Sequence, residues 1–338
     1  MSDDLLIVGA GPIGLACAIS AKRRGFDPLV IDAGPIAAAI TRYPVGMTFF
    51  TTPERLEIGG HPLVCSGAKA TREEALKYYR GVVRAEELRV RTFVRLADVR
   101  RDGDTLRCRL TSRTADAEHL AAKVVLATGY FEHPNLLGVP GEALAHVSHY
   151  AEEPHVTAGL DVVIVGAKNS AIEQALNCFR AGARVTVISR RTELKPSVKY
   201  WLRPDFENRV KAGEISVRWG AAVTAIDAGG VTISIGGRHE RLPADKVYLL
   251  TGYRPDFDLF RRAGIALDQE SCRPVLNPET LETNVPGIHM AGSVTAGLNI
   301  SEVFIENGRY DGEKIFGDPA SRTRAEAAYS RETRATGE

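Results

Sequence analysis

Apolar runs and turn residues alternate along the chain in a way that predicts strands followed by helices. A short apolar run at Leu5–Val8 leads into glycines, and small and apolar residues at helical spacing follow from about Gly14 to Arg24. A second apolar run ends at Asp32. A buried strand, an amphipathic helix and a second strand are typical of a β-α-β unit in a parallel sheet. We therefore expect such a unit between about Asp4 and Asp32.

The same pattern recurs in the second half of the chain. Asp161–Val165 predicts a buried strand, a glycine turn follows, and a helix to about Arg180 leads to the strand Val185–Ile188. Each copy later reaches a strand that ends in Thr-Gly-Tyr, at residues 128–130 and 251–253. A repeat on this scale favours two copies of one structural module. The fold class is therefore α/β, with two doubly wound, Rossmann-like domains.

The segments between these landmarks predict further elements. Thr71 and Glu74 fit a capping box at the start of a helix that runs to about Leu88. Gly46–Thr52 is rich in aromatic and hydroxyl residues and predicts a loop before a short helix near Pro53–Ile58. A β-meander that returns to a parallel strand is expected from β-rich segments in each copy. In the first copy these are Val90–Leu96, Asp98–Arg101, Leu106–Thr111 and Lys123–Leu126.

The two Thr-Gly segments suggest where the domains begin and end. We expect a discontinuous first domain of residues 1–131 and 254–317, with residues 132–253 inserted as the second domain. A helix is expected at Ser301–Ile315. Residues 318–338 are charged and lack large apolar side chains apart from Tyr329, so we expect a flexible tail.

Composition excludes several classes of protein. The chain has 338 residues, of which 44% are hydrophobic and 25% charged, as in ordinary globular proteins. A net charge of +1 does not suggest a nucleic acid or an anionic membrane as partner. No apolar run approaches the roughly 18 residues of a membrane span, and the N-terminus enters a strand without a leader pattern. We therefore expect a cytoplasmic protein.

The five cysteines are scattered and form no C-x-x-C pair. Neither a disulfide framework nor a zinc site is indicated, and we expect no metal. Isolated cysteines in such a chain are typically small buried hydrophobic residues.

The first glycine turn has the pattern G-x-G-x-x-G, at Gly9, Gly11 and Gly14. The first glycine permits the tight turn, the second allows the backbone to approach a pyrophosphate, and the third allows close helix packing. The pyrophosphate would lie at the helix N-terminus, where free N–H groups and the helix dipole favour negative charge. Asp32 follows at the spacing expected of an acid that binds a ribose.

The second glycine turn differs in charge. Lys168 replaces the middle glycine, and Ala171 takes the place of the third. Where the first copy has Asp32, the second has Ser189-Arg190-Arg191. Arginines bind a 2′-phosphate through charge-assisted hydrogen bonds, whereas a carboxylate would repel it. The second site is therefore expected to prefer NADPH, and the first a nucleotide with a free 2′-hydroxyl.

Together these motifs resemble those of flavoproteins with two dinucleotide-binding domains, and especially the low-molecular-weight thioredoxin reductase group. The resemblance implies FAD in the first site, NADPH in the second, and hydride transfer from the nicotinamide to flavin N5. A narrower resemblance, to the bacillithiol-disulfide reductase family, rests on residues 47–54, 75–80, 166–171, 199–205 and 304–309. It implies reduction of a low-molecular-weight thiol disulfide, or of a mixed disulfide on a small redoxin.

The candidate cofactor-binding residues lie in the two glycine turns, at the ends of the strands that follow, and in the loop after Gly46. They are Gly9, Gly11, Pro12, Ile13, Gly14, Asp32, Ala33, Met47, Thr48, Phe49, Thr51, Val94, Ala127, Thr128, Gly129, Tyr130, Gly166, Lys168, Asn169, Ser170, Ala171, Ser189, Arg190, Arg191, Thr251, Gly252, Tyr253, Gly292 and Ser293. Ser293 stands where many relatives have an aspartate that binds the ribitol of the flavin.

Two departures from the family patterns concern the route of the electrons. The dithiol of thioredoxin reductases would lie near Tyr150–Glu153, where this chain has no cysteine. The bacillithiol family typically has a cysteine in the first fingerprint, where this chain has Ile13. Cys17 lies one helical turn further on, and we expect it to pack in the core. No catalytic residue is assigned from the sequence.

The sequence therefore predicts an NADPH-dependent FAD oxidoreductase with a small-molecule or small redox-protein acceptor. One alternative is a thiol-free flavin reductase that passes electrons to ferredoxin, a quinone or another acceptor. A second is a slow NADP(H)-sensing flavoprotein, and a third, less favoured, is a monooxygenase. We also expect a homo-oligomer, either a dimer or a tetramer.

Overall fold

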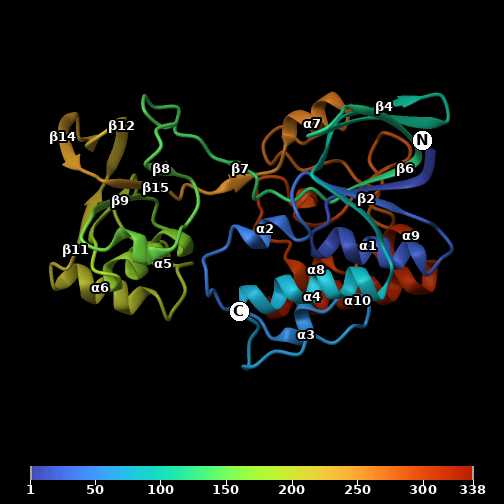
Figure 1. Cartoon of the computed structure of the whole chain (residues 1–338), viewed down its shortest axis with the longest axis horizontal. Helices are drawn as coiled ribbons and strands as arrows, with labels where there is room; N and C mark the ends of the chain where they lie inside the picture. The colour runs from blue at the N-terminus through green and yellow to red at the C-terminus, as the bar shows by residue number, and fades with distance from the viewer. Residues whose placement is uncertain (1, 337–338) are drawn as a thin grey trace. The chain divides into compact units, whose positions relative to one another are not determined.

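The computed structural model describes residues 2–336, and these form two compact units. Unit 1 contains the described residues up to Thr41, Gly46–His133, and those from Tyr253 onward. Unit 2 contains Arg42–Val45 and Pro134–Gly252, and holds the green and yellow elements of Figure 1. The sequence predicts residues 132–253 as the inserted segment, whereas the inserted part of unit 2 begins at Pro134 and ends at Gly252.

Unit 1 is built on a seven-stranded sheet with the order β3-β2-β1-β6-β5-β4, in which β17 also pairs with β6. Five strands are mutually parallel: β1 (Ser2–Val8), β2 (Leu29–Asp32), β3 (Arg89–Thr92), β6 (Ala117–Leu126) and β17 (Ile288–Met290). The antiparallel pairs join β4 (Val94–Asp102), β5 (Thr105–Ser112) and β6. Because β1, β2, β6 and β17 are parallel, the residues that follow them meet at one edge of the sheet.

The helices of unit 1 pack on this sheet and on one another (Figure 1). They are α1 (Pro12–Lys22), α2 (Ala38–Thr41), α3 (Pro53–Leu56), α4 (Arg72–Ala85), α7 (Phe257–Arg262), η2 (Gly292–Ala296), α8 (Ile305–Gly308), α9 (Asp311–Phe316) and α10 (Pro319–Thr336). The predicted capping box is confirmed: Thr71 and Glu74 bond reciprocally at the start of α4. Among the described residues, every helix is too short or too polar to cross a membrane.

Unit 2 repeats the parallel sheet on a smaller scale, with the order β11-β10-β9-β15-β8, and adds the antiparallel sheet β12-β13-β14. Its elements are β8 (Val147–Ser148), η1 (Pro154–Thr157), β9 (Asp161–Val165), α5 (Asn169–Arg180), β10 (Arg184–Ser189), α6 (Arg203–Lys211), β11 (Ile215–Trp219), β12 (Ala221–Asp227), β13 (Gly230–Ile235), β14 (Arg238–Pro243) and β15 (Lys246–Leu249). The connecting strands β7 (His133–Pro134) and β16 (Tyr253–Arg254) form a two-stranded sheet. The expected class, α/β with two doubly wound modules, is confirmed.

Two local predictions were wrong. The segment Val90–Leu96 is not one strand of a meander, because Phe93 adopts a left-handed conformation (φ +60°) that separates β3 from β4. Strand β3 continues the parallel part of the sheet instead. Arg42–Val45 groups with unit 2, where the Arg42 guanidinium donates a hydrogen bond to the Tyr150 hydroxyl (3.2 Å).

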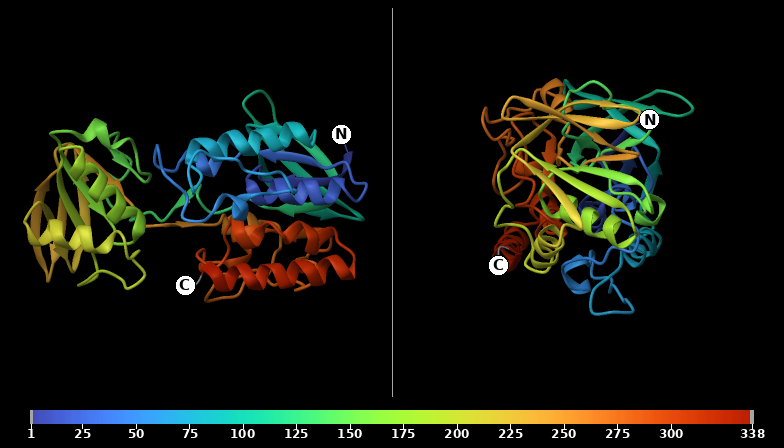
Figure 2. Two further views of the ribbon diagram at one scale, coloured as in Figure 1. Left: turned by 90° about the horizontal axis from the view of Figure 1, so that it is seen from below. Right: turned by 90° about the vertical axis from the view of Figure 1, so that its left-hand side faces the viewer.

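The expected flexible tail of residues 318–338 is also wrong, because residues 319–336 form helix α10, which packs along α8 and α9 (Figures 1 and 2). Residues 337 and 338 lie outside the described residues. The buried surface of α10 uses alanines such as Ala325 and Ala328 rather than large apolar residues. The Lys314 ammonium on α9 lies 2.5 Å from the Glu326 carboxylate and 4.5 Å from the centre of the Tyr329 ring. Small residues and charge pairs therefore hold a helix that hydrophobicity alone does not predict.

Asn307 links α8 to the preceding loop and to α10, and it offers a test of this packing. Its amide is fully buried, accepts from the Phe304 N–H (2.8 Å), and donates to the Glu302 carbonyl (2.9 Å) and the Thr333 hydroxyl (3.1 Å). Asn307→Ala leaves buried groups unpaired, so we expect the free energy of unfolding to fall by about 2–4 kcal/mol in urea titrations. The exposed Asn299→Ala should change it by less than about 0.5 kcal/mol. Equal stability of the two variants would contradict this role.

Candidate nucleotide-binding sites

The first glycine turn is shaped by contacts between backbone atoms. A Cβ atom on Gly9, which has φ +113°, would lie 2.3 Å from the Ala127 carbonyl oxygen, and one on Gly14 would lie 1.9 Å from the Gly9 oxygen. A Cβ on Gly11 would meet no atom within 4 Å. Gly9 and Gly14 therefore pack against other backbone atoms, whereas the space beside Gly11 is open. Open space beside the middle glycine is what a pyrophosphate needs in order to approach the backbone.

Helix α1 begins at this turn without a side-chain cap. Gly11 is its N-cap residue, Pro12 and Ile13 follow, and no side chain bonds the first N–H groups. The N–H groups of the first turn have no acceptor within the helix, and the helix dipole makes this end attractive to an anion. This arrangement fits a dinucleotide pyrophosphate.

Asp32, the last residue of β2, bonds the backbone of the glycine turn. Its carboxylate accepts hydrogen bonds from the N–H groups of Ala10 and Gly34, both at 2.7 Å. Burial raises the pKa of Asp32, and the two N–H donors oppose this shift. Ala33 follows it, while Val94 begins β4 and packs in the core of unit 1. Asp32 thus holds the turn in place as well as lying where a ribose is expected.

The loop after Gly46 is held against the start of α4. The Met47 carbonyl accepts from the Arg72 N–H (2.8 Å), Thr48 forms a bridge with Thr71, and Phe49 is buried. The hydroxyl of Thr51 is buried and has no hydrogen-bond partner among the described residues.

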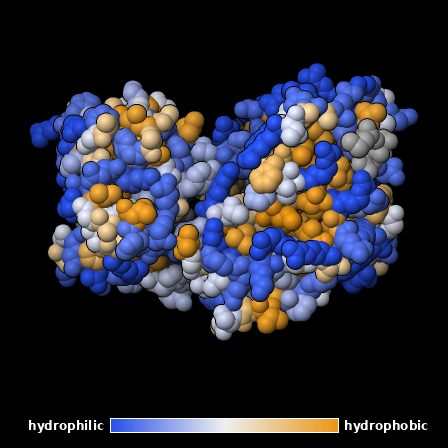
Figure 3. All heavy atoms as spheres, in the orientation of Figure 1, coloured by the Kyte–Doolittle hydropathy of each residue, from blue (hydrophilic) through white to orange (hydrophobic). Residues whose placement is uncertain are grey.

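A second unpartnered hydroxyl lies at the edge of the sheet. Thr128 follows β6 and its hydroxyl is also buried without a partner in the described part of the chain. Buried hydroxyls without a partner indicate that a ligand or water completes their hydrogen bonding. Ala127 is tied to β1 by its N–H bond to the Val8 carbonyl (2.8 Å), and Gly129, with Tyr130 after it, turns at φ +66°. Figure 3 shows apolar side chains gathered in the part of unit 1 where Figure 1 places α1.

Gly292 and Ser293 reach the same edge through β17. Ala291 donates its N–H to the Leu126 carbonyl (3.0 Å), and Ser293 is buried at the start of η2. The Gly292 N–H donates to the carboxylate of Asp311 at 2.7 Å. Burial raises the pKa of Asp311 to about 7, and the Gly292 N–H opposes the shift. Asp311 is not predicted from the sequence, because no local pattern links it to a turn nineteen residues earlier.

Ile13 fills the space where the family pattern places a cysteine. A Cβ built on Gly292 or on Gly308 would lie 2.7 Å from its Cδ1 atom, so the side chain packs closely against both glycines. Cys17, one turn later, is fully buried, and burial together with the Asp311 and Glu313 carboxylates raises its pKa. A thiolate at Cys17 is therefore disfavoured, as expected for a core residue.

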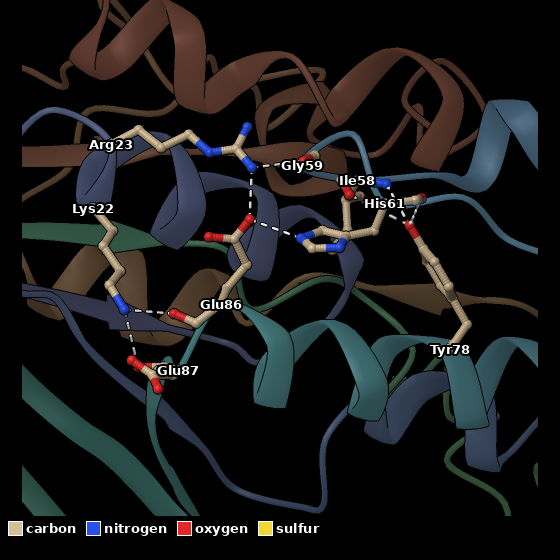
Figure 4. Close-up of polar contacts among 8 residues, drawn as sticks. All are labelled: Lys22, Arg23, Ile58, Gly59, His61, Tyr78, Glu86 and Glu87. Atoms are coloured by element: carbon tan, nitrogen blue, oxygen red, sulfur yellow. Dashed lines mark hydrogen bonds and ion pairs between the residues drawn. The ribbon is translucent and has the colours of Figure 1, made fainter.

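The far end of α1 is fixed by a network of ionic and hydrogen bonds (Figure 4). Arg23 donates to the Gly59 carbonyl and to the Glu86 carboxylate, both at 2.6 Å, and His61 lies 2.8 Å from the same carboxylate. The Tyr78 hydroxyl donates to the His61 carbonyl (2.8 Å). These bonds join the end of α1 to the loop after α3 and to the end of α4.

The second turn, in unit 2, has the same backbone geometry. Gly166 has φ +135°, and a Cβ there would lie 2.5 Å from the Leu250 carbonyl oxygen and 3.2 Å from the Ala171 side chain. Helix α5 starts after Lys168 without a side-chain cap, so Asn169, Ser170 and Ala171 present its first N–H groups. This end also fits a pyrophosphate.

Three cations lie in or near this turn: Lys168 belongs to the turn, and Arg191 and Lys195 belong to the connection between β10 and α6. Arg191 and Lys168 are exposed, and their charges lower the pKa of Lys195. Within residues 2–336, neither these three nor the exposed Arg190 forms an ion pair with a carboxylate. The Ser189 hydroxyl accepts from the Arg191 N–H (3.1 Å), which fixes the start of the Arg190-Arg191 segment. Lys195 was missed in the sequence, although it lies in a visibly basic segment.

The remaining candidates follow β15. The Thr251 hydroxyl donates to the Asn135 carbonyl (2.7 Å), and Gly252 turns at φ +94°. Tyr253 belongs to unit 1 rather than to the inserted unit, and its ring lies 4.2 Å from that of Phe131, centre to centre. The sequence had grouped Tyr253 with the second domain.

Each unit has an uncapped helix start at a glycine turn, with a carboxylate beside the first and cations beside the second. This arrangement is typical of proteins with two dinucleotide-binding domains. The model of the family "Pyridine nucleotide-disulphide oxidoreductase" matches residues 6–292. The chain belongs to this family, and it is an NADPH-dependent flavin oxidoreductase that uses FAD and NADPH. The family resemblance seen in the sequence is confirmed.

Similar proteins span almost the whole chain. Bacilliredoxin reductase Bdr of Bacillus subtilis is 40% identical over 95% of this chain and 99% of its own length. The bacillithiol disulfide reductase Bdr (YpdA) of Bacillus cereus has a TM-score of 0.90 at 40% identity, over 98% of this chain and all of its own. The Staphylococcus aureus enzyme of the same name has a TM-score of 0.87 at 34% identity, over 98% and 99%.

The buried carboxyl of Asp311 predicts a pH dependence of stability. An unfolded aspartate has a pKa of about 4, so between about pH 4 and pH 7 the folded chain binds the additional proton. Ionisation therefore weakens the folded state as the pH rises through this window. Asp311→Asn keeps an acceptor for the Gly292 N–H without the charge. We expect its stability relative to the parent to rise by about 2 kcal/mol between pH 5 and pH 8, measured by urea unfolding.

The exposed Asp104→Asn serves as the control, because its carboxylate remains in solvent. Its stability relative to the parent should not change across the same pH range. A pH-independent difference between Asp311→Asn and the parent would contradict the assignment.

Proposed function

We propose that this enzyme reduces the disulfide of a low-molecular-weight thiol, or a mixed disulfide on a small redoxin, with NADPH as the reductant. For a low-molecular-weight disulfide the balanced reaction is NADPH + H⁺ + RSSR → NADP⁺ + 2 RSH. The observation that carries this proposal is the similarity, over nearly the whole chain, to reductases named for bacilliredoxin and for bacillithiol disulfide.

We assign FAD to unit 1 and NADPH to unit 2. The support is the contrast between Asp32 after β2 and Ser189-Arg190-Arg191 after β10, at equivalent places in the two modules. When bound, these cofactors would supply hydride transfer, and no protein acid is assigned to that step. The first N–H groups of α1 and α5 would hold the two pyrophosphates, and Asp32 and the glycines would anchor the surrounding turns.

A second candidate is a thiol-free reductase that passes electrons to ferredoxin, a quinone or another acceptor. The observation that favours it is Ile13, packed against Gly292 and Gly308 where the family pattern has a cysteine. Cys17 is buried with a raised pKa and does not replace that thiol. Under either candidate, electrons leave the flavin without a cysteine in the first fingerprint.

An acceptor screen with purified holoenzyme distinguishes these candidates. We expect one NADPH to be consumed for each disulfide reduced, with two thiols released, measured by absorbance and thiol titration under anaerobic conditions. Oxidation of NADPH with quinones or ferredoxin but with no disulfide would establish the second candidate. Flavin reduction without rapid reoxidation by any acceptor would instead favour a slow NADP(H)-sensing protein.

Coenzyme preference tests the assignment of NADPH to unit 2. Arg191→Ala and Arg190→Ala each remove a cation proposed to contact the 2′-phosphate. We expect the KM for NADPH to rise about tenfold or more, and the KM for NADH to change by less than about twofold. Arg238→Ala, which removes an exposed arginine on β14, is the matched control. An unchanged preference in both variants would overturn the assignment.

A homo-oligomer and a cytoplasmic location remain predictions. Light scattering coupled to size-exclusion chromatography measures the first directly, with a dimer or a tetramer as the expected result.

A further inference from the structure

Asn169 joins two segments that lie 30 residues apart in the sequence and border the proposed NADPH site. Its Oδ1 accepts a hydrogen bond from the Lys199 N–H (2.9 Å), and its Nδ2 donates to the Ser197 carbonyl (3.5 Å). Asn169 is also the first residue of α5, directly after the glycine turn. Its side chain therefore fastens loop 194–202 to the turn that binds the pyrophosphate.

Loop 194–202 has an ordered inner side and an exposed outer side. Leu194, Val198 and Leu202 are buried in the core of unit 2. The Arg203 guanidinium donates to the carbonyls of Leu194 and Lys195, both at 3.1 Å. The outer side carries Lys195 and an aromatic pair, Tyr200 and Trp201, of which Tyr200 is 82% exposed. The loop is thus held at residues 194 and 195 by Arg203 and at residues 197 and 199 by Asn169, and the two anchors together set where Lys195 lies.

The positive charges on and near loop 194–202 favour the binding of an anion. Arg191 and Lys195 lie on the connection between β10 and α6, and Lys168 lies in the glycine turn. The charges of Arg191 and Lys168 lower the pKa of Lys195. Like charges held close together repel one another, and no carboxylate among the described residues pairs with them. A phosphate group removes this repulsion and accepts several hydrogen bonds.

We propose that Asn169 is a positioning residue for coenzyme specificity: by holding loop 194–202 against the glycine turn, it places Lys195 beside Arg191 so that both bind the 2′-phosphate of NADPH. The inference rests on the proposed function in so far as NADPH binds unit 2. Asn169 acts on the 2′-phosphate through the loop and does not contact it. Discrimination between NADPH and NADH then depends partly on a side chain at the pyrophosphate turn.

The test uses two nucleotides that differ only in the 2′-phosphate, namely 2′,5′-ADP and 5′-AMP. Each is titrated into the FAD-loaded enzyme and followed by calorimetry. In Asn169→Ala we expect the affinity for 2′,5′-ADP to fall about tenfold and that for 5′-AMP by less than about twofold. Asn208→Ala, which removes an exposed asparagine on α6, should alter neither affinity.

A double-mutant cycle tests whether Asn169 acts through Lys195. Lys195→Ala should weaken 2′,5′-ADP binding in the parent but have a clearly smaller effect in the Asn169→Ala background. Asn169→Asp retains the acceptor for the Lys199 N–H. Its negative charge should weaken the binding of both nucleotides, while the ratio of their affinities stays near that of the parent. This variant replaces Asn169→Ala in the test if Asn169→Ala fails to fold.

Equal losses for both nucleotides in Asn169→Ala, or additive effects in the cycle, would overturn the proposal and confine Asn169 to the turn itself. A parent enzyme that binds 2′,5′-ADP no better than 5′-AMP would contradict the assignment of NADPH to unit 2, and this inference with it. The measurement on the parent alone therefore separates a failure of the NADPH assignment from a failure of the role proposed for Asn169.

Discussion

The close approach of backbone to backbone at the two glycine turns is the constraint on which the rest of the structure depends. In unit 1 the Cα atoms of Gly9 and Gly14 lie so near the Ala127 and Gly9 carbonyls that no side chain fits. Gly166 repeats this contact against the Leu250 carbonyl in unit 2. Each contact holds a helix start at the carboxyl edge of a parallel sheet, where its free N–H groups face solvent. A phosphate-binding end is thus built into the main chain, and the side chains around it determine which nucleotide is bound.

The two units show how one module is adapted by charge. Unit 1 uses the Asp32 carboxylate to bind the N–H groups of its own turn, and it buries a second carboxylate, Asp311, beneath Gly292. Unit 2 has Ser189 at the equivalent place and presents cations in its glycine turn and on the connection from β10 to α6 instead. The backbone is nearly the same in both, so electrostatics rather than fold separates the two sites. The link from Asn169 to loop 194–202 suggests that even this separation depends on how the segments are tied together.

The packing of Ile13 places an apolar side chain at the start of α1. A cysteine at the start of a helix is stabilised as a thiolate by the helix dipole, and such a thiolate is the usual nucleophile in disulfide chemistry. Here the same position is an apolar contact that joins α1 to η2 and α8. The nearest thiol in the helix, Cys17, is buried beside carboxylates that disfavour its ionised form. The chain therefore keeps the scaffold of its relatives while lacking a thiol at this place.

The sequence by itself determined the two modules, their glycine turns, the capping box at Thr71 and the charge contrast between Asp32 and Arg190-Arg191. These features follow from local rules, because glycine conformations, apolar periodicity and residue charge are properties of short segments. Only the tertiary structure showed that residues 319–336 form α10, since that helix is held by alanines and charge pairs whose partners lie on α8 and α9. It alone brought Asp311 to Gly292 and Asn169 to loop 194–202, because contacts between distant segments leave no periodic signal in the chain.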